Sequence, residues 1–268
     1  LAMAHITVGT AWLFLEEARG QAYLDERLKI ELKHGNPEYI VNLYAYFGAT
    51  CAELYRFQAA EHYLLEGIEF VADRGLGIFV RLMKAWLTLP HIHLGRWDDA
   101  VELANRLQQN LPGSAIRRIP MLVALGRLRA RRGDPGAEEA LANALVQASQ
   151  SATLQHLGPV HAARAEAAWL TGDFTRAVQE ARAAYPLSVE KKHPWLAGEL
   201  AFWQWKSGEK VEIQPWMARP FSLQIAGDWR AAAEEWQRLG CPYERARALA
   251  DGDTQAQAAA LNIFEQLG

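Results

Sequence analysis

The sequence predicts an all-α protein, built as a right-handed superhelix of repeated helical hairpins. Segments of about 11 to 18 residues, rich in Ala, Leu, Glu, Arg and Gln, carry apolar residues at helical spacing. Alternating strand patterns are nearly absent. A short cassette also recurs along the chain, which is typical of repeat architectures. These three observations favour stacked helices over any fold with a sheet.

Regular breakers divide the chain into about fifteen expected short helices. Glycine, proline and small polar residues punctuate such helices because they end one helix or cap the next. The breakers, in order, are Gly35-Asn36-Pro37, Asp73-Arg74-Gly75, Gly95, Leu111-Pro112-Gly113, Gly133-Asp134-Pro135, Thr171-Gly172-Asp173, Pro186, Ser207-Gly208, Gly227-Asp228, Gly240-Cys241-Pro242 and Asp251-Gly252-Asp253.

The repeated cassette reads Gly-Arg-Trp-Asp-Asp-Ala at 95–100, Gly-Asp-Phe-Thr-Arg-Ala at 172–177 and Gly-Asp-Trp-Arg-Ala-Ala at 227–232. A fourth copy at 55–60 has Tyr in the Gly position, and Gly133 opens a degenerate fifth. Glycine permits the left-handed backbone that ends a helix, and the polar residue caps the next one. The aromatic residue is expected to fill the gap between the helices, and Ala to let them approach. Each cassette therefore predicts the elbow of a helical hairpin.

The elbows at 55, 95, 133 and 172 are 40, 38 and 39 residues apart, close to one repeat length, whereas the next gap is 55 residues. That gap contains four prolines. We therefore expect helical repeats over 1–185, an irregular or degenerate repeat over 186–220, and a C-terminal repeat with capping helices over 221–268. The first copy also carries Tyr44-x2-Phe47-Gly48 in the positions of the tetratricopeptide W-x2-L-G motif.

Composition restricts the environment and the partners. The formal net charge is -3 and the chain has two cysteines, which favours a reducing, cytoplasmic compartment and argues against direct nucleic-acid binding. The apolar stretch 6–15 is about half of the ~20 residues that a membrane span needs, so no membrane association is expected. Because the chain starts at Leu1 and stops at Gly268 after an amphipathic run, we expect both ends to continue in a longer protein.

No motif predicts catalysis. Neither a phosphate-binding Gly-x4-Gly-Lys loop nor a Gly-x-Gly-x-x-Gly occurs, and no Ser/His/Asp grouping can be assembled. Asp98 and Asp99 resemble the acidic motif of diphosphate-handling helical enzymes, but they occupy a cassette position, where acids suit a helix start. His91 and His93 lack the i, i+4 spacing of a helical metal pair. We therefore expect no enzyme activity, no cofactor and no metal site.

Six arginines between Arg117 and Arg132 make one expected helix strongly basic. The pattern fits either a solvated helix face or an anion-binding stripe in a groove. In tetratricopeptide register, six residues project from first helices toward the concave surface and form the candidate ligand or partner groove: Asn42, Glu53, His93, Arg127, Arg131 and Glu166.

Longer segments resemble a known family. These are Ala124-Leu-Gly-Arg-Leu-Arg-Ala-Arg-Arg-Gly-Asp-Pro-Gly136, Ala163-Arg-Ala-Glu-Ala-Ala-Trp-Leu-Thr-Gly-Asp173, Trp195-Leu-Ala-Gly-Glu-Leu-Ala201 and Ile225-Ala-Gly-Asp-Trp-Arg-Ala-Ala-Ala-Glu-Glu-Trp236. They are similar to the helical region of large bacterial ATP-dependent LuxR-type (maltose-activator-like) transcriptional regulators.

The resemblance implies a non-catalytic sensor region that binds an inducer or partner and biases an ATPase switch. It also implies partners in the same protein, an ATPase domain and a DNA-binding domain, both absent from this chain. The inducer itself is not implied. The alternative is a free-standing tetratricopeptide-like scaffold that binds a peptide in its concave groove. A third class, a diphosphate-handling enzyme, needs a second acidic cluster facing Asp98 and Asp99, which the sequence does not offer.

Overall fold

The computed structural model describes residues 2–15, 17–72, 74, 76–110 and 115–268, and all regular structure within them is helical. The all-α prediction is therefore confirmed at that level. The predicted breakers at Gly75 and at 111–113 lie outside the described residues. The described helices are α1 (Ala2–Leu15), α2 (Glu17–His34), α3 (Pro37–Glu53), α4 (Phe57–Val71), α5 (Gly77–His93), α6 (Trp97–Asn110), the 3₁₀ helix η1 (Ala115–Arg118), α7 (Ile119–Arg132), α8 (Ala137–Ser151), α9 (Leu154–Leu170), α10 (Phe174–Glu190), α11 (Pro194–Lys206), α12 (Arg219–Ile225), α13 (Trp229–Arg238), α14 (Pro242–Leu249) and α15 (Thr254–Leu267).

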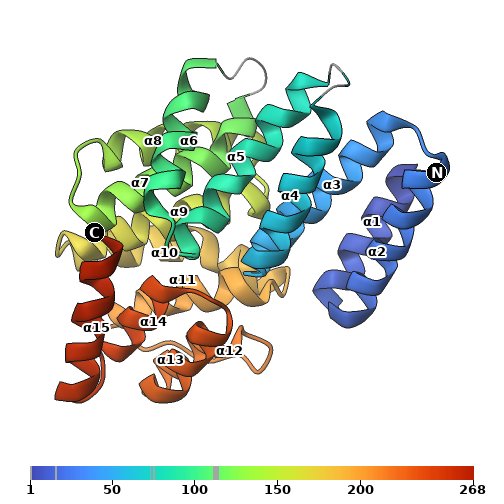
Figure 1. Cartoon of the computed structure of the whole chain (residues 1–268). Coiled ribbons are helices and arrows are strands. Elements are labelled where there is room, and N and C mark those ends of the chain that lie inside the picture. Colours follow the sequence, from blue (N-terminus) through green and yellow to red (C-terminus); the bar gives the residue numbers. More distant parts are fainter. Residues whose placement is uncertain (1, 16, 73, 75, 111–114) are drawn as a thin grey trace. The chain divides into compact units, whose positions relative to one another are not determined.

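The chain divides into two compact units, Leu1–Pro90 and His91–Gly268, here called unit 1 and unit 2. In unit 1, α1 pairs with α2 and α3 pairs with α4, and α3 also packs on α1 and α2 (Figure 1). Close packing depends on small residues: a Cβ added at Gly67 of α4 would lie 2.6 Å from Met83 and from Tyr44. Unit 1 is thus built from helical hairpins, each burying one face against its neighbour.

Unit 2 continues the hairpin pattern from α6 to α15. The helix α7 packs on α8 and α9, and α9 packs on α10 and α11. Beyond α11, an aromatic cluster of Trp195, Phe202, Phe221 and Trp236 joins α11 to α12 and α13, with neighbouring ring centroids 5.1–6.3 Å apart. The arrangement is compatible with a helical repeat region.

The elbow prediction is confirmed at every cassette. Gly95, Gly133, Gly172 and Gly227 all have φ between 72° and 84°, and Tyr55 has φ 56° in the same left-handed region. The residue after each elbow donates its backbone N–H to the carbonyl five positions earlier, for example Asp173 to Ala168 at 2.9 Å. This is the bond of the Schellman motif, which satisfies carbonyls at a helix end. The same bond recurs after Gly208 and Gly240, which stand in predicted breakers, and after Lys192, which the sequence did not indicate.

The other cassette positions behave less uniformly. The side chains of Asp173 and Asp228 accept hydrogen bonds from backbone N–H groups three residues on, as predicted for caps. The alanines five positions after the elbows are buried. Among the aromatics, Trp97 is 4% exposed and Trp229 is partly buried.

The prediction that Phe174 fills a gap in the core is wrong, because its side chain is 49% exposed. Its ring lies against Trp169 of the preceding helix, at 6.4 Å between centroids. Trp97, in contrast, is covered by Tyr243 from α14, at 5.9 Å between centroids. Burial at this position therefore depends on a distant helix and not on the cassette itself.

The predicted break at Pro186 is also wrong, since α10 continues through it to Glu190. Proline removes one backbone hydrogen bond from a helix interior. Ala181, Ala184 and Ser188 nevertheless keep one buried face on both sides of the proline. That packing maintains the helix, and the non-helical segment of this region lies instead between α11 and α12.

No helix in the described part of the chain combines the length and hydropathy required to cross a bilayer.

Candidate functional site

A network of buried charged side chains in unit 2 is the strongest candidate site. It begins on α7, where Gly126 permits close approach to α8: a Cβ there would lie 2.5 Å from Leu141. Arg127 and Arg131 are four residues apart and therefore share one face of α7. Both side chains are directed away from solvent, with exposures of 4% and 0%.

The repeat register places the partners of these arginines. Arg127 and Glu166 each stand six residues before an elbow glycine, Gly133 and Gly172, so they occupy equivalent positions in successive hairpins. His93 and Arg131 are likewise equivalent, each two residues before an elbow. Stacked first helices bring equivalent positions into line.

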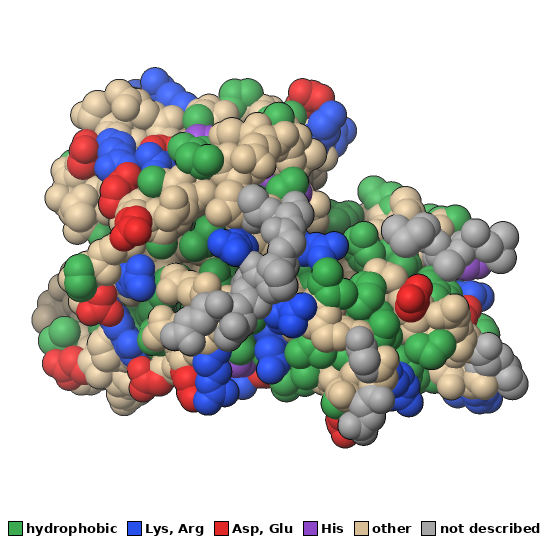
Figure 2. Space-filling view, turned by 90° about the horizontal axis from the view of Figure 1, so that it is seen from above, with side chains coloured by type: hydrophobic (Ala, Val, Ile, Leu, Met, Phe, Trp, Pro, Cys, Tyr) green, Lys and Arg blue, Asp and Glu red, His purple; other side chains and the backbone are tan. Residues whose placement is uncertain are grey.

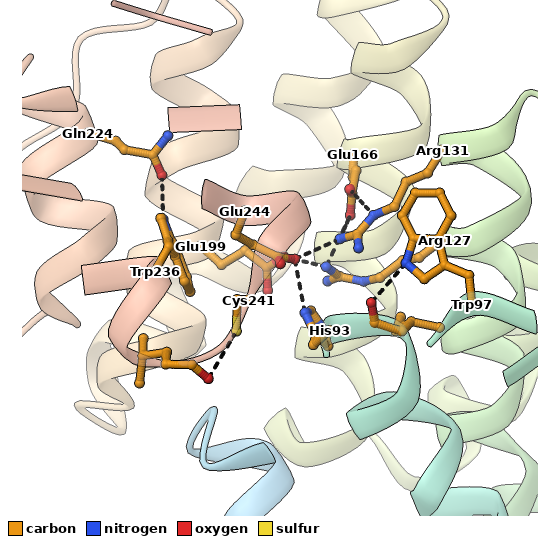
Figure 3. Close-up of polar contacts among 12 residues, drawn as sticks. His93, Trp97, Arg127, Arg131, Glu166, Glu199, Gln224, Trp236, Cys241 and Glu244 are labelled. Carbon is orange, nitrogen blue, oxygen red and sulfur yellow. Dashed lines mark hydrogen bonds and ion pairs between the residues drawn. The ribbon is translucent and has the colours of Figure 1, made fainter. Parts of the chain in front are cut away.

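Figure 3 shows the arginines meeting carboxylates from α9 and α11. Arg127 Nη1 lies 3.0 Å from Glu166 Oε2 and 2.7 Å from Glu199 Oε1. Arg131 Nε donates to Glu166 Oε1 at 2.8 Å, and its Nη2 is 3.3 Å from Oε2 of the same carboxylate. Glu166 is thus held by two guanidinium groups.

The helix α14 completes the network from the far end of the sequence. Glu244 Oε1 accepts hydrogen bonds from His93 Nδ1 at 2.9 Å and from Arg131 Nη2 at 3.0 Å. Glu244 is 2% exposed, and His93 is 4% exposed. Arg247, one turn further along α14, lies with its guanidinium 4.2 Å from the centre of the Phe202 ring.

The protonation states follow from this geometry. Burial favours a protonated Glu244, but the electrostatic interaction and hydrogen bond with His93, together with the charges of Arg131 and Arg247, outweigh it and hold the carboxyl pKa well below its usual range. Burial lowers the pKa of His93, and the nearby Arg131 and Arg127 lower it further against the pull of Glu244. We therefore assign a neutral His93 that donates Nδ1–H to an ionised Glu244.

With His93 neutral, the three arginines and three glutamates of the network balance in charge. Burial by itself would lower the pKa of Arg131, yet Glu166 and Glu244 raise it above its ordinary value. Removing one member of a buried pair leaves its partner uncompensated, which is costly. The network consequently makes the placement of α14 depend on the charge of α7 and α9.

Of the six sequence-predicted groove residues, His93, Arg127, Arg131 and Glu166 meet in this network. Asn42 and Glu53 belong to α3 of unit 1, where Asn42 Nδ2 donates to the backbone carbonyl of Glu38 at 2.7 Å. Ligand binding by all six residues stays a prediction.

The basic segment does not act as a single stripe. Arg127 and Arg131 are buried against carboxylates, whereas Arg129 donates to the carbonyl of Gly136 and Arg132 pairs with the exposed Asp98. One helix therefore divides its arginines between internal pairs and surface contacts.

Sequence reasoning missed Glu199, Glu244 and Arg247. Glu199 is a single acid within the apolar run Pro194-Trp-Leu-Ala-Gly-Glu-Leu-Ala-Phe-Trp203, which is a signal for a buried, paired charge. Glu244 lies two residues after the Gly240-Cys241-Pro242 turn, a position that does not by itself indicate a buried charge. Neither position indicates a partner.

The remaining chemistry-bearing residues have structural settings. Cys51 and Cys241 are both buried, and burial raises the pKa of the Cys241 thiol well above its ordinary value. No group of three His, Cys, Asp or Glu side chains that could hold a metal ion occurs within the described ranges.

No protein-family model matches this sequence, and no curated protein matches it significantly. The fold and the network together define an all-α protein of consecutive helical hairpins. The buried network of His93, Arg127, Arg131, Glu166, Glu199, Glu244 and Arg247 is called the ionic centre below.

Proposed function

We propose that the chain is a non-catalytic sensor and interaction region of a bacterial transcriptional regulator of the LuxR type, acting on an ATPase domain encoded outside this sequence. The observation that carries the proposal is the period of the elbows at 55, 95, 133 and 172, each with the same left-handed turn. Helical hairpins repeated at a fixed period are characteristic of solenoids that bind proteins or small ligands.

We further propose a tetratricopeptide-like right-handed superhelix. Two contacts support it: α8 packs on α9 of the next hairpin, and α10 packs on α11 of the next. In tetratricopeptide arrays each second helix lies between its own first helix and the following one. The period here is longer than the ~34 residues of that motif, which corresponds to longer helices.

A sensing role needs two states of different ligand affinity. The ionic centre supports such a role because it joins His93, α7, α9 and α11, all within unit 2, to α14 through a few contacts. A change at any one of these charges alters the placement of the C-terminal helices. The distribution of charged side chains also fits a region that does not bind DNA itself. On the face drawn in Figure 2, Lys and Arg side chains are interspersed with acidic, hydrophobic and uncharged ones and do not form one basic patch.

The first test is the reading frame of the complete gene. We expect a phosphate-binding loop upstream of codon 1 and a helix-turn-helix downstream of codon 268. Absence of both would overturn the regulator proposal and favour the scaffold that binds a peptide.

The second test measures transcription in the source bacterium. Arg131→Met in the full-length protein should alter the transcript levels of its target genes beyond what any fall in its abundance explains, with wild type expressed at the same reduced level as the reference, because it breaks the ionic centre. Arg132→Met is the matched control, one residue away, with the surface acid Asp98 as its ion-pair partner and the Trp97 ring centre 5.4 Å from its guanidinium carbon. Identical transcript profiles for Arg131→Met, Arg132→Met and wild type would argue against a signalling role.

A further inference from the structure

His93 and Arg131 hold the Glu244 carboxylate as a binding site would hold a carboxylate ligand, with both side chains donating to one of its oxygens. We propose that His93 and Arg131 form a subsite for the carboxylate of a small organic acid, and that Glu244 of α14 fills it in the present state. The proposal rests on the proposed sensor function only in treating these buried residues as a ligand-binding site. Its test does not involve transcription, so the two can fail separately.

The cationic side of the subsite is held without α14. Arg131 is fixed by two contacts to Glu166, and Glu166 in turn by Arg127. Arg127 is anchored again by Glu199 at 2.7 Å. All of these partners lie on α7, α9 and α11, so the guanidinium keeps its position when Glu244 is absent.

Among the described residues, Glu244 accepts side-chain hydrogen bonds through only one of its two carboxylate oxygens. Its Oε1 receives both hydrogen bonds, while Oε2 is buried with no hydrogen-bond partner among the described residues. In the same described set, Nη1 of Arg131 and Nε and Nη2 of Arg247 are also buried without a hydrogen-bond acceptor. Buried polar atoms without a hydrogen-bond partner cost free energy, so α14 docks less tightly than its buried area implies. A carboxylate with free orientation can satisfy more of these atoms.

The donor chemistry selects a carboxylate. A guanidinium N–H and an imidazole N–H converge on a single oxygen, which is the charge-assisted arrangement that carboxylates favour. The surrounding space is occupied by Tyr243, whose ring lies 3.8 Å from the Arg131 guanidinium carbon and packs on Phe264. Because that ring borders the subsite, the proposal is restricted to a small acid such as acetate.

The C-terminal helices can respond as a unit. The elbow at Gly240 is the turn between α13 and α14, which pack on each other, and α13 is also anchored to α12 by Trp236 and Phe221 at 5.1 Å between ring centroids. An acid that takes the place of Glu244 therefore changes the docking of α14 and α15 while α12 and α13 keep their aromatic contacts.

The test uses the whole chain with Glu244→Ala and measures amide hydrogen exchange by mass spectrometry. Loss of the carboxylate should speed exchange across 242–267 by about tenfold or more, with α9 and α10 within about twofold of wild type. Sodium acetate at about 0.2 M should reverse most of that change, because ligand bound to the native state protects it, whereas sodium chloride of equal ionic strength should not.

Two controls make the result specific. The double variant Glu244→Ala with Arg131→Met lacks the cation and should not respond to acetate, and wild type, with its subsite filled, should show no acetate-specific slowing. If Glu244→Ala does not fold, recovery of soluble chain on refolding in acetate but not in chloride is the equivalent readout. Equal effects of acetate and chloride, or faster exchange spread evenly over 91–268, would overturn the proposal.

Discussion

His93 and Glu244 are 151 positions apart in the sequence, yet His93 Nδ1 lies 2.9 Å from Glu244 Oε1 and both side chains are buried. The contact joins the end of α5 to the start of α14. It places the C-terminal helices of unit 2 against its first elbow. The stability of α14 and α15 is therefore tied to charges that the intervening helices provide.

Arg131→Met should lower the free energy of unfolding by about 3–5 kcal/mol, because it leaves Glu166 and Glu244 buried beside one cation fewer. Arg132→Met should cost less than about 1 kcal/mol, since the partner side chain, Asp98, is 93% exposed. Urea unfolding followed by circular dichroism measures both. Equal losses in the two variants would show that the ionic centre contributes nothing beyond a surface pair.

Gly95→Ala should be more destabilising than Gly172→Ala, although both glycines have φ 80°. The left-handed backbone costs each alanine about 1–2 kcal/mol. At Gly172 the new Cβ meets nothing within 4 Å, whereas at Gly95 it would lie 2.8 Å from the Pro242 ring and 2.9 Å from Leu267. The excess at Gly95, on the order of 1–3 kcal/mol, measures the docking of α14 and α15. Indistinguishable melting curves would contradict that docking.

Trp97→Ala should cost about 3–5 kcal/mol, as expected for a buried aromatic side chain. Its indole N–H also donates to the carbonyl of Ile92 at 2.9 Å, so truncation removes a hydrogen bond at the elbow. Phe174→Ala, at the same cassette position but 49% exposed, should cost less than about 1 kcal/mol. Thermal melts of the two variants give the comparison; a larger loss for Phe174→Ala would reverse our interpretation of the cassette.

Stability should fall as the pH is lowered from about 6.5 toward about 4, the window of histidines that fold neutral. Burial lowers the pKa of His193 to about 4, and burial also lowers the pKa of His93 and of His156. The unfolded chain then binds protons that the folded chain does not, so each such histidine removes up to about 1.4 kcal/mol per pH unit. Stability from these groups is fully present above pH 6.5.

His193→Asn tests the contribution of one of these histidines. The His193 ring caps α11 by accepting a hydrogen bond from the backbone N–H of Leu196 at 3.3 Å, and protonation would remove this acceptor. Asparagine retains a capping oxygen without titrating. The variant should show a shallower loss of unfolding free energy between pH 6.5 and 4 in urea titrations. An unchanged slope would exclude His193 as a source of the acid sensitivity.

The helices and the elbows could be predicted from the amino-acid sequence alone. Local rules suffice for them: a left-handed residue ends a helix, a polar side chain caps the next, and both act within a few residues, as at Gly172 and Asp173. The sequence could even place Tyr55 in a glycine position, because the surrounding cassette was intact. It failed at Pro186, where packing on both sides of the proline outweighs one lost hydrogen bond.

The pairing of the buried charged side chains depends on the tertiary structure. The register of the elbows aligns Arg127 with Glu166, and sequence reasoning could place these on one surface. The partners Glu199 and Glu244 come from other helices, 72 positions from Arg127 and 113 positions from Arg131, and no local rule pairs residues so far apart. Exposure of Phe174 against burial of Trp97 has the same origin. Whether a side chain at an elbow is covered depends on which distant helix packs over it, and that is fixed by the whole fold.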